Sequence, residues 1–228
     1  MTLTAARLPG SSNWPGAPRR PGSPGWQGTP WEPVGPAPQP PGQVPATRVW
    51  LDPDQTLTQR LLDQRIVLAA GILDDEAATR LSAQLLTLDA EAATPVRMEL
   101  QNLRAELPAA LTVMGVLDTL RAEVTVHASG LIAGPALGVL AACPVRLGYP
   151  NSSFGFSEPR IDLGGVLTAS ALAAREQQVQ RMLDSLWHRL AEVTGHEAGD
   201  IRDDAREGRT LTVAEAIGYG ILTARAER

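Results

Sequence analysis

Short apolar runs alternate with amphipathic segments between residues 65 and 147, and this alternation restricts the chain to a small number of folds. Residues 65–71 (RIVLAAG) form a compact apolar run that ends at glycine, as expected of a buried parallel strand. After Asp74, leucines and alanines recur at spacings of three and four until Pro95, which is typical of a helix that buries one face. Because this alternation continues, the sequence predicts an α/β domain with parallel strands joined by right-handed crossovers.

The same patterns locate the remaining elements. Further strands are predicted at residues 96–100, 124–128 and 145–147, and further helices at residues 57–64, 108–120 and 134–142. Residues 210–220 are predicted to contain a last short helix and strand.

Residues 169–194 contain neither proline nor glycine, and Gly195 follows them directly, so they predict one long helix. About 26 residues at 1.5 Å each make a rod about 39 Å long, which is more than a domain of this size needs for its own core. We therefore expect part of the apolar stripe of this helix to pack against another subunit. The candidate interface residues are Leu172, Val179, Leu183, Leu186 and Leu190.

Residues 1–47 differ in composition from the rest of the chain. Twelve of the nineteen prolines lie there, with glycines between them and with Trp14, Trp26 and Trp31 spaced along the segment. Such a composition predicts a disordered tail, followed by one domain at residues 48–228. Two roles for the tail remain open. It is either a solvated extension or a docking segment whose tryptophans and polyproline II turns bind a partner.

The composition excludes several classes of function. A formal net charge of -5, spread without blocks of one sign, argues against nucleic acid or an anionic membrane as a partner. All basic residues are arginine, which excludes mechanisms that need a lysine amine. Cys143 is the only cysteine, no apolar run reaches the roughly 18 residues of a membrane span, and Leu8-Pro9-Gly10 interrupts any signal peptide. We expect a cytoplasmic protein without cofactor or metal.

Blocks of residues 57–222 resemble the proteolytic subunit of the ATP-dependent Clp protease, ClpP. They include Pro150-Asn151-Ser152 followed by Glu158-Pro159, and Thr194-Gly195. Residues 61–67, 74–78, 83–88, 118–119, 174–176, 212–216 and 219–220 match further family blocks in the same order. The resemblance implies the ββα spiral that ClpP shares with crotonases, with residues 169–194 as a handle helix through which two heptameric rings meet. The implied partners are ClpP paralogues, in homo- or hetero-oligomeric rings, and an AAA+ Clp ATPase.

The resemblance also implies a Ser-His-Asp triad, and each of its positions is changed in this chain. The turn that carries the nucleophile corresponds to residues 130–136, which places the nucleophile position at Gly134. The histidine position falls on Ser157 and the aspartate position on Gly208. The oxyanion loop of the family corresponds to residues 102–107 and lacks the glycine pair of the family.

Acyl transfer by a serine needs a base for its proton and preorganised N–H donors for the oxyanion. Loss of one triad member lowers the rate by about 10⁴ to 10⁶ in serine proteases, so we expect negligible peptidase activity. A relocated site is not predicted. Ser129 and His127 lie two residues apart on one strand, which does not give a base the geometry it requires. His188 and His196, in the long helix and at its end, are expected to stay away from the cleft, and a Ser-Lys dyad requires lysine.

Three functions remain open on these grounds. The first is a non-catalytic ClpP homologue that acts as a structural or regulatory ring subunit. The second is an active Clp-type serine endopeptidase with an unrecognised site. The third is a crotonase-like acyl-CoA enzyme, which would use a backbone N–H such as that of Gly134 and for which Glu158 is the only nearby carboxylate. Otherwise Ser153, Ser157 and Glu158 are expected to form hydrogen bonds at strand ends.

Overall fold

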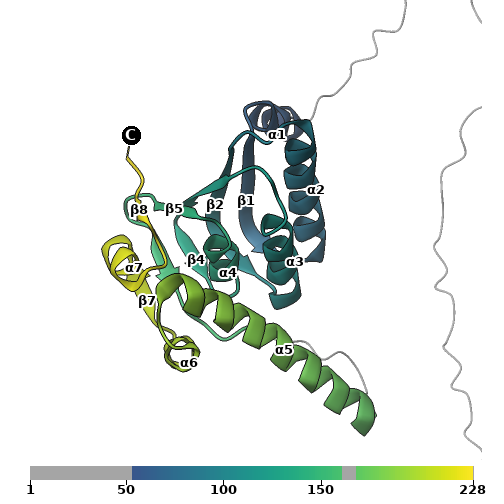
Figure 1. Cartoon of the computed structure of the whole chain (residues 1–228), viewed down its shortest axis with the longest axis vertical. Coiled ribbons are helices and arrows are strands. Elements are labelled where there is room, and N and C mark those ends of the chain that lie inside the picture. Colours follow the sequence, from purple (N-terminus) through teal and green to yellow (C-terminus); the bar gives the residue numbers. More distant parts are fainter. Residues whose placement is uncertain (1–52, 161–167, 228) are drawn as a thin grey trace, which may run out of the picture. The chain divides into compact units, whose positions relative to one another are not determined.

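The computed structural model of the protein describes residues 53–160 and 168–227 (Figure 1). The predicted tail, residues 1–47, lies outside the described residues.

One sheet forms the centre of the fold. Its eight strands within the described residues follow the order β7-β6-β4-β2-β3-β5-β8, and β1 lies on the other edge of β2. The strands are β1 (Ile66–Leu73), β2 (Val96–Ala105), β3 (Val124–Ser129), β4 (Leu131–Ala133), β5 (Val145–Gly148), β6 (Ser153–Gly155), β7 (Thr210–Thr212) and β8 (Ala224–Arg225).

The sheet divides at β2. The strand β3 pairs in parallel with the first half of β2, from Val96 to Gln101, whereas β4 pairs with the second half at Arg104. Because β3 and β4 share one edge of β2, the sheet curls at this point, and β4, β6 and β7 form a separate arm. This arm positions the candidate site.

Helices α2, α3 and α4 pack together on one face of the sheet (Figure 1). Alternate residues of β2, Val96, Met98 and Leu100, are at most 1% exposed because they point toward this layer. The helices are α1 (Pro53–Asp63), α2 (Asp75–Glu91), α3 (Leu107–Leu117), α4 (Ala136–Ala141), α5 (Ala169–Thr194), α6 (Ala198–Glu207) and α7 (Val213–Tyr219). Among the described residues, no helix is long and apolar enough to cross a membrane.

The long helix is confirmed at residues 169–194. The side chain of Thr168 caps the helix by accepting a hydrogen bond from the N–H of Ala171, and Gly195 ends it in the left-handed conformation with φ 73°. The C-terminal part of α5 packs against α3 and α4, and the N-terminal part extends beyond the sheet (Figure 1). The sequence pattern therefore located both ends of this helix.

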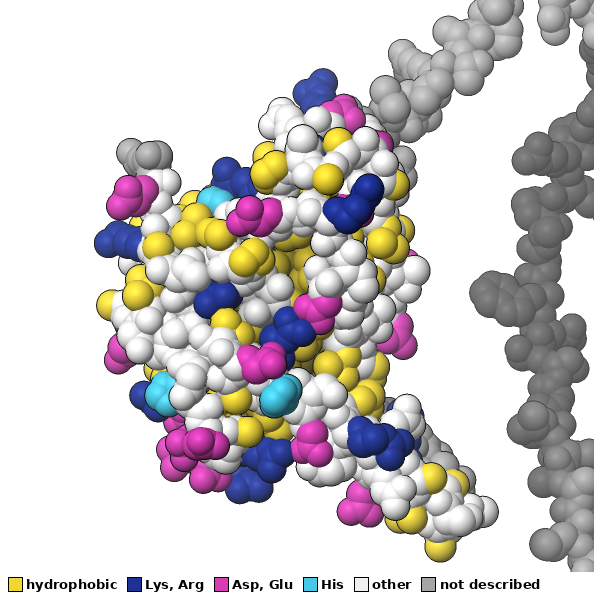
Figure 2. Space-filling view, in the orientation of Figure 1, with side chains coloured by type: hydrophobic (Ala, Val, Ile, Leu, Met, Phe, Trp, Pro, Cys, Tyr) yellow, Lys and Arg dark blue, Asp and Glu magenta, His cyan; other side chains and the backbone are white. Residues whose placement is uncertain are grey.

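The predicted interface residues of α5 differ in exposure. Leu186 and Leu190 belong to the core of the chain itself, and Leu183 packs partly against that core. Val179 is also buried, whereas Leu172 is 45% exposed. Figure 2 shows apolar side chains at the protruding end of α5, where Leu172 lies. The exposure leaves Leu172 as the main candidate for contact with a second subunit.

The predicted parallel strands are confirmed except for one pair, because β7 runs antiparallel to β6. The structure also adds α6, β4, β6 and β8, which were not predicted. The last three are at most three residues long, too short for a periodic pattern. In addition, β2 continues five residues beyond its predicted end at residue 100, to Ala105.

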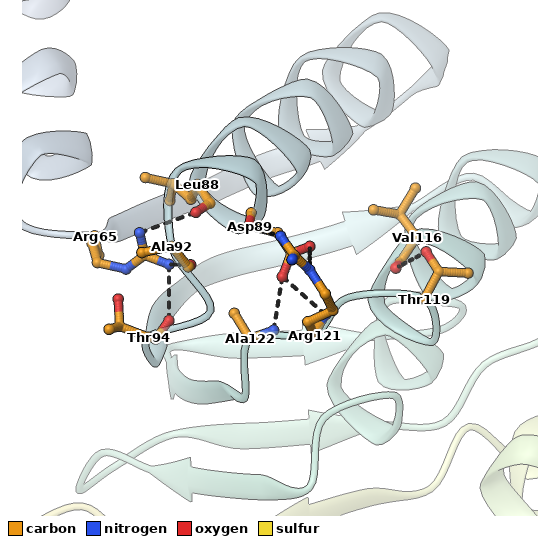
Figure 3. A network of polar contacts seen from close by, with 9 residues as sticks. All are labelled: Arg65, Leu88, Asp89, Ala92, Thr94, Val116, Thr119, Arg121 and Ala122. Carbon is orange, nitrogen blue, oxygen red and sulfur yellow. Dashed lines mark hydrogen bonds and ion pairs between the residues drawn. The ribbon is translucent and has the colours of Figure 1, made fainter.

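The side chains of two residues form hydrogen bonds that hold the C-terminal end of α2 against neighbouring segments (Figure 3). Arg65, which has a left-handed backbone (φ 58°), donates to the carbonyl oxygens of Leu88, Ala92 and Thr94 at 2.8 to 3.0 Å. These carbonyls lie at or just after the end of α2, where helical partners are missing. An arginine therefore caps the helix.

The second of these residues is Asp89, near the end of α2. Its Oδ1 accepts hydrogen bonds from the backbone N–H groups of Arg121 and Ala122 at 2.9 and 2.8 Å. Arg121 returns a hydrogen bond from its guanidinium to the carbonyl oxygen of Asp89 at 2.6 Å (Figure 3). The backbone N–H of Ala122 is the main cause that holds the pKa of Asp89 below its ordinary value.

Candidate functional site

The first two positions of the expected triad lie next to each other. Gly134 follows β4 with φ +62°, and its N–H donates to the carbonyl oxygen of Gly155 at 2.9 Å. A Cβ atom on Gly134 would lie 3.0 Å from Oγ of Ser157. The parallel pairing of β4 with β6 produces this proximity, since both residues lie just beyond the paired ends. The structure thus brings Gly134 and Ser157 together.

The third position lies on the neighbouring strand. Gly208 ends α6 in the left-handed conformation, and the carbonyl oxygen of Arg209, directly after it, accepts a hydrogen bond from the N–H of Phe156 at 2.7 Å. In the antiparallel register of β6 and β7, Gly155 lies opposite Thr210. Ser157 follows the end of β6 by two residues and Gly208 precedes β7 by two, so both lie beyond the same end of this strand pair. No described atom lies within 4 Å of the place that a Cβ of Gly208 would occupy. The three positions therefore lie just beyond the ends of β4, β6 and β7.

The Pro150-Asn151-Ser152 block makes the turn between β5 and β6. Asn151 has φ 67°, a left-handed conformation that asparagine tolerates better than most residues. Ser152 is 3% exposed and donates from Oγ to the carbonyl oxygen of Ala128 at 3.0 Å. The block thus directs the chain into β6, which carries Ser157 at its far end.

The side chains near Gly134, Ser157 and Gly208 contact one another. Asp204 accepts a hydrogen bond from the hydroxyl of Tyr219 at 2.6 Å and forms an ion pair with Arg209 at 3.0 Å. Burial, and then the hydrogen bond to Asp204, raise the pKa of Tyr219 above its ordinary value. Arg209 also lies over the Tyr219 ring, 5.2 Å from its centroid. The carboxylate of Asp204 is therefore engaged by a cation and a hydroxyl.

Glu158 forms an ion pair with Arg206 of α6, with 3.5 Å between the charged atoms, rather than the expected strand-end hydrogen bond. Both side chains are more than 60% exposed, so this pair contributes little to stability. Within the ranges that the structure covers, no group of histidine, cysteine, aspartate and glutamate side chains could hold a metal ion.

The segment that corresponds to the oxyanion loop, residues 102–107, covers the end of β2 and the start of α3. Asn102 has φ 46°, and its Oδ1 accepts a hydrogen bond from the N–H of Leu131 at 3.1 Å. Its side chain lies against Gly130, where a Cβ would be 2.1 Å from Oδ1. Two residues later, Arg104 pairs with Ala133 directly before Gly134. Asn102, whose role the sequence reasoning missed, holds the turn between β3 and β4 in place.

The histidines and Ser129 do not form a relocated catalytic pair. Ser129 donates from Oγ to the carbonyl oxygen of Leu100 at 3.3 Å, and His127 packs beside Tyr149. Nε2 of His188 lies 3.4 Å from Oε1 of Glu192 on the surface of α5.

His196 packs against Tyr219. Its ring stacks on that of Tyr219 at 4.1 Å, and the Tyr219 ring in turn contacts Phe156 at 5.2 Å. Two ring contacts therefore separate His196 from Phe156, which directly precedes Ser157. The stacked ring faces Tyr219, which is a packing role.

Comparison with known proteins places this geometry in a family. The family described as Clp protease matches residues 53–225. A proteolytic subunit 1 of the ATP-dependent Clp protease from Rhodococcus jostii is 31% identical over 72% of this chain and 75% of its own length. Proteolytic subunit 2 from Treponema denticola is 25% identical over 75% of this chain and 86% of its own length.

A solved structure agrees with these relatives. A point mutant of ClpP1 from Listeria monocytogenes superposes with a TM-score of 0.65 and 26% identity. The match covers 75% of this chain and 96% of that protein. Since the family match spans most of the described fold, including the strands that bring Gly134, Ser157 and Gly208 together, the chain belongs to the Clp protease family.

Proposed function

We propose that this protein is a non-catalytic member of the Clp protease family that acts as a structural or regulatory ring subunit. The observation that carries the proposal is the pair of Gly134 and Ser157. The position expected for the nucleophile has no side chain, and the residue that faces it is a serine rather than a base. A hydroxyl next to a glycine has no means of activating a nucleophile.

The surroundings of this pair support the same proposal. The N–H of Gly134 is already bonded to Gly155, so it is not free to stabilise an oxyanion in this conformation. Arg104 pairs with Ala133 in the segment expected to supply oxyanion donors. Gly208, at the position of the expected aspartate, has no side chain that could orient a histidine. These features support the proposal that the chain does not catalyse acyl transfer.

The assembly role rests on family membership and on the protruding helix. Relatives named proteolytic subunits of the ATP-dependent Clp protease match most of this chain, and Leu172 leaves apolar surface on the protruding part of α5. We infer that the protein assembles into rings, either alone or mixed with active ClpP paralogues, and that two such rings meet through α5. In these rings it alters the gating, the number of active sites or the docking of an AAA+ Clp ATPase.

Two measurements on the purified full chain test this proposal. A fluorophosphonate probe and a model peptide report catalysis, and native mass spectrometry reports assembly, each with and without an active ClpP paralogue. We expect neither labelling nor cleavage by this chain alone, and mixed rings with the paralogue. Labelling that disappears in Ser129→Ala or Ser157→Ala would demonstrate an active serine, whereas a persistent monomer would contradict the ring-subunit role.

A further inference from the structure

Four polar side chains from neighbouring strands meet on the face of the sheet opposite α2 and α3. Arg97 and Glu99 lie on β2, His127 lies beside Glu99 in the parallel register of β2 and β3, and Tyr149 directly follows β5. Glu99 is only 9% exposed. A carboxylate with so little contact with water needs partners for its charge.

Arg97 and Tyr149 are those partners. Arg97 donates from Nε to Oε1 of Glu99 at 2.6 Å, and its Nη2 forms an ion pair with the same oxygen. The same Nη2 donates to the hydroxyl of Tyr149 at 2.6 Å, and this hydroxyl donates to Oε1 of Glu99 at 3.3 Å. The three groups form a closed ring of hydrogen bonds in which Glu99 is the only anion.

His127 lies beside this ring without joining it. Its ring centroid is 5.8 Å from that of Tyr149, and its Nδ1 is buried without a hydrogen-bond partner among the residues that the structure describes. Burial lowers the pKa of His127, the charge of Arg97 lowers it further, and the charge of Glu99 opposes both. The neutral imidazole is thus favoured at neutral pH.

The other neighbours of His127 in the sheet carry no charge. Leu147 lies opposite it on β5, and Leu68 lies on the far side of Glu99 on β1. Thr125 and Ser129, its neighbours on the same face of β3, are also uncharged. The protonation of His127 is therefore coupled to Arg97 and Glu99 rather than to a wider field of charges.

We propose that Arg97 and His127 compete for Glu99, and that mild acid transfers this carboxylate from Arg97 to protonated His127. His127 takes up one proton from solvent, no covalent bond changes, and the net charge of the cluster rises by one. Arg97 can turn outward, because 44% of its side chain is already exposed. The sheet face then presents a free guanidinium at pH values where histidine titrates. This inference is independent of whether the protein is catalytic.

Nuclear magnetic resonance of the full chain tests the exchange, because the protein has only three histidines and two tyrosines. We expect the titration midpoint of His127 to lie below the ordinary value for histidine. Glu99→Gln should lower the His127 midpoint further, and Arg97→Gln should raise it. The ring signals of Tyr149 should shift with the same midpoint as His127. His188 and His196 serve as internal controls that neither substitution moves.

The opposite signs expected for the two variants make the test specific. The proposal would be overturned if the titration midpoint of His127 stayed the same in both variants, or if it moved in the same direction in both. If one variant fails to fold by circular dichroism, the other variant and the Tyr149 signals of the unsubstituted protein still decide. Tyr149 signals that do not follow His127 would also overturn it.

Discussion

Arg189 of α5 and Asp118 at the end of α3 form a bidentate ion pair. Nη1 lies 2.8 Å from Oδ1, and Nη2 lies 2.6 Å from Oδ2. The two residues are 71 positions apart, so the pair fastens the handle helix to the helical layer of the core. Parallel hydrogen bonds of this kind fix direction as well as distance, which a single contact does not.

We predict measurable coupling between these two residues. In a double-mutant cycle with Arg189→Gln and Asp118→Asn, the coupling free energy should be about 0.5–1 kcal/mol, because the pair has good geometry but remains partly exposed. Urea unfolding of the four proteins measures it. Arg181→Gln, on the same helix, should show no coupling with Asp118→Asn. Equal coupling for Arg181 and Arg189 would disprove the specific pairing.

Restoring the triad by substitution should not restore full activity. We expect the triple variant Gly134→Ser, Ser157→His, Gly208→Asp to cleave peptides about 10² to 10³ times more slowly than an active family member, because residues 102–107 still lack the glycine pair expected to supply oxyanion donors. The left-handed backbone at residue 134 adds strain of about 1–2 kcal/mol for any side chain. A peptidase assay of assembled rings measures this. Activity equal to that of an active ClpP would show that the segment around Asn102 supplies an oxyanion hole.

Arg146 should stabilise the folded protein by binding the C-terminal segment. It is 8% exposed, and its guanidinium donates to the carbonyl oxygens of Cys143, Gly220 and Ile221 at 2.8 to 3.3 Å. Arg146→Met leaves these acceptors without a donor, so the free energy of unfolding should fall by about 2–3 kcal/mol. Urea denaturation measures this, with Arg181→Met as a surface control. A loss equal to that of the control would refute this role.

The stability contributed by Asp89 should depend on pH. Its pKa is lower in the folded protein than in the unfolded chain, so its contribution is present above the unfolded pKa and is lost as pH falls through the folded pKa. Asp89→Asn should therefore destabilise the protein at neutral pH, and the difference from the original protein should shrink in acid. Thermal unfolding at several pH values measures this, with Glu91→Gln on the same helix as control. A difference that stays constant down to the acid range would be inconsistent with this linkage.

The elements that were predicted well are those whose structure is determined by residues close together in the sequence. The handle helix was located to the residue because residues 169–194 contain no breaker and lie between Thr168 and Gly195, which have the chemistry of helix caps. The strands β1 and β3 were found because their apolar runs end at glycine or polar residues. Local hydrogen bonding and burial of one face act over only a few residues, so the sequence shows them directly.

The short strands could not be predicted in this way. β4, β6 and β8 contain at most three residues each, and they become strands only because partners elsewhere in the chain pair with them. The antiparallel direction of β7 depends on α6, which turns the chain back toward β6. Strand propensity depends on such neighbours more than helix propensity does.

For the candidate site, the sequence by itself determined which residue types occupy the positions of the expected triad: Gly134, Ser157 and Gly208. It also determined that no lysine can replace the missing base. Only the tertiary structure decided that Gly134 faces Ser157. It also decided that Glu99 binds Arg97 and Tyr149 and lies beside His127. The physical reason is that both arrangements arise from strand pairing between distant segments, which no local pattern specifies.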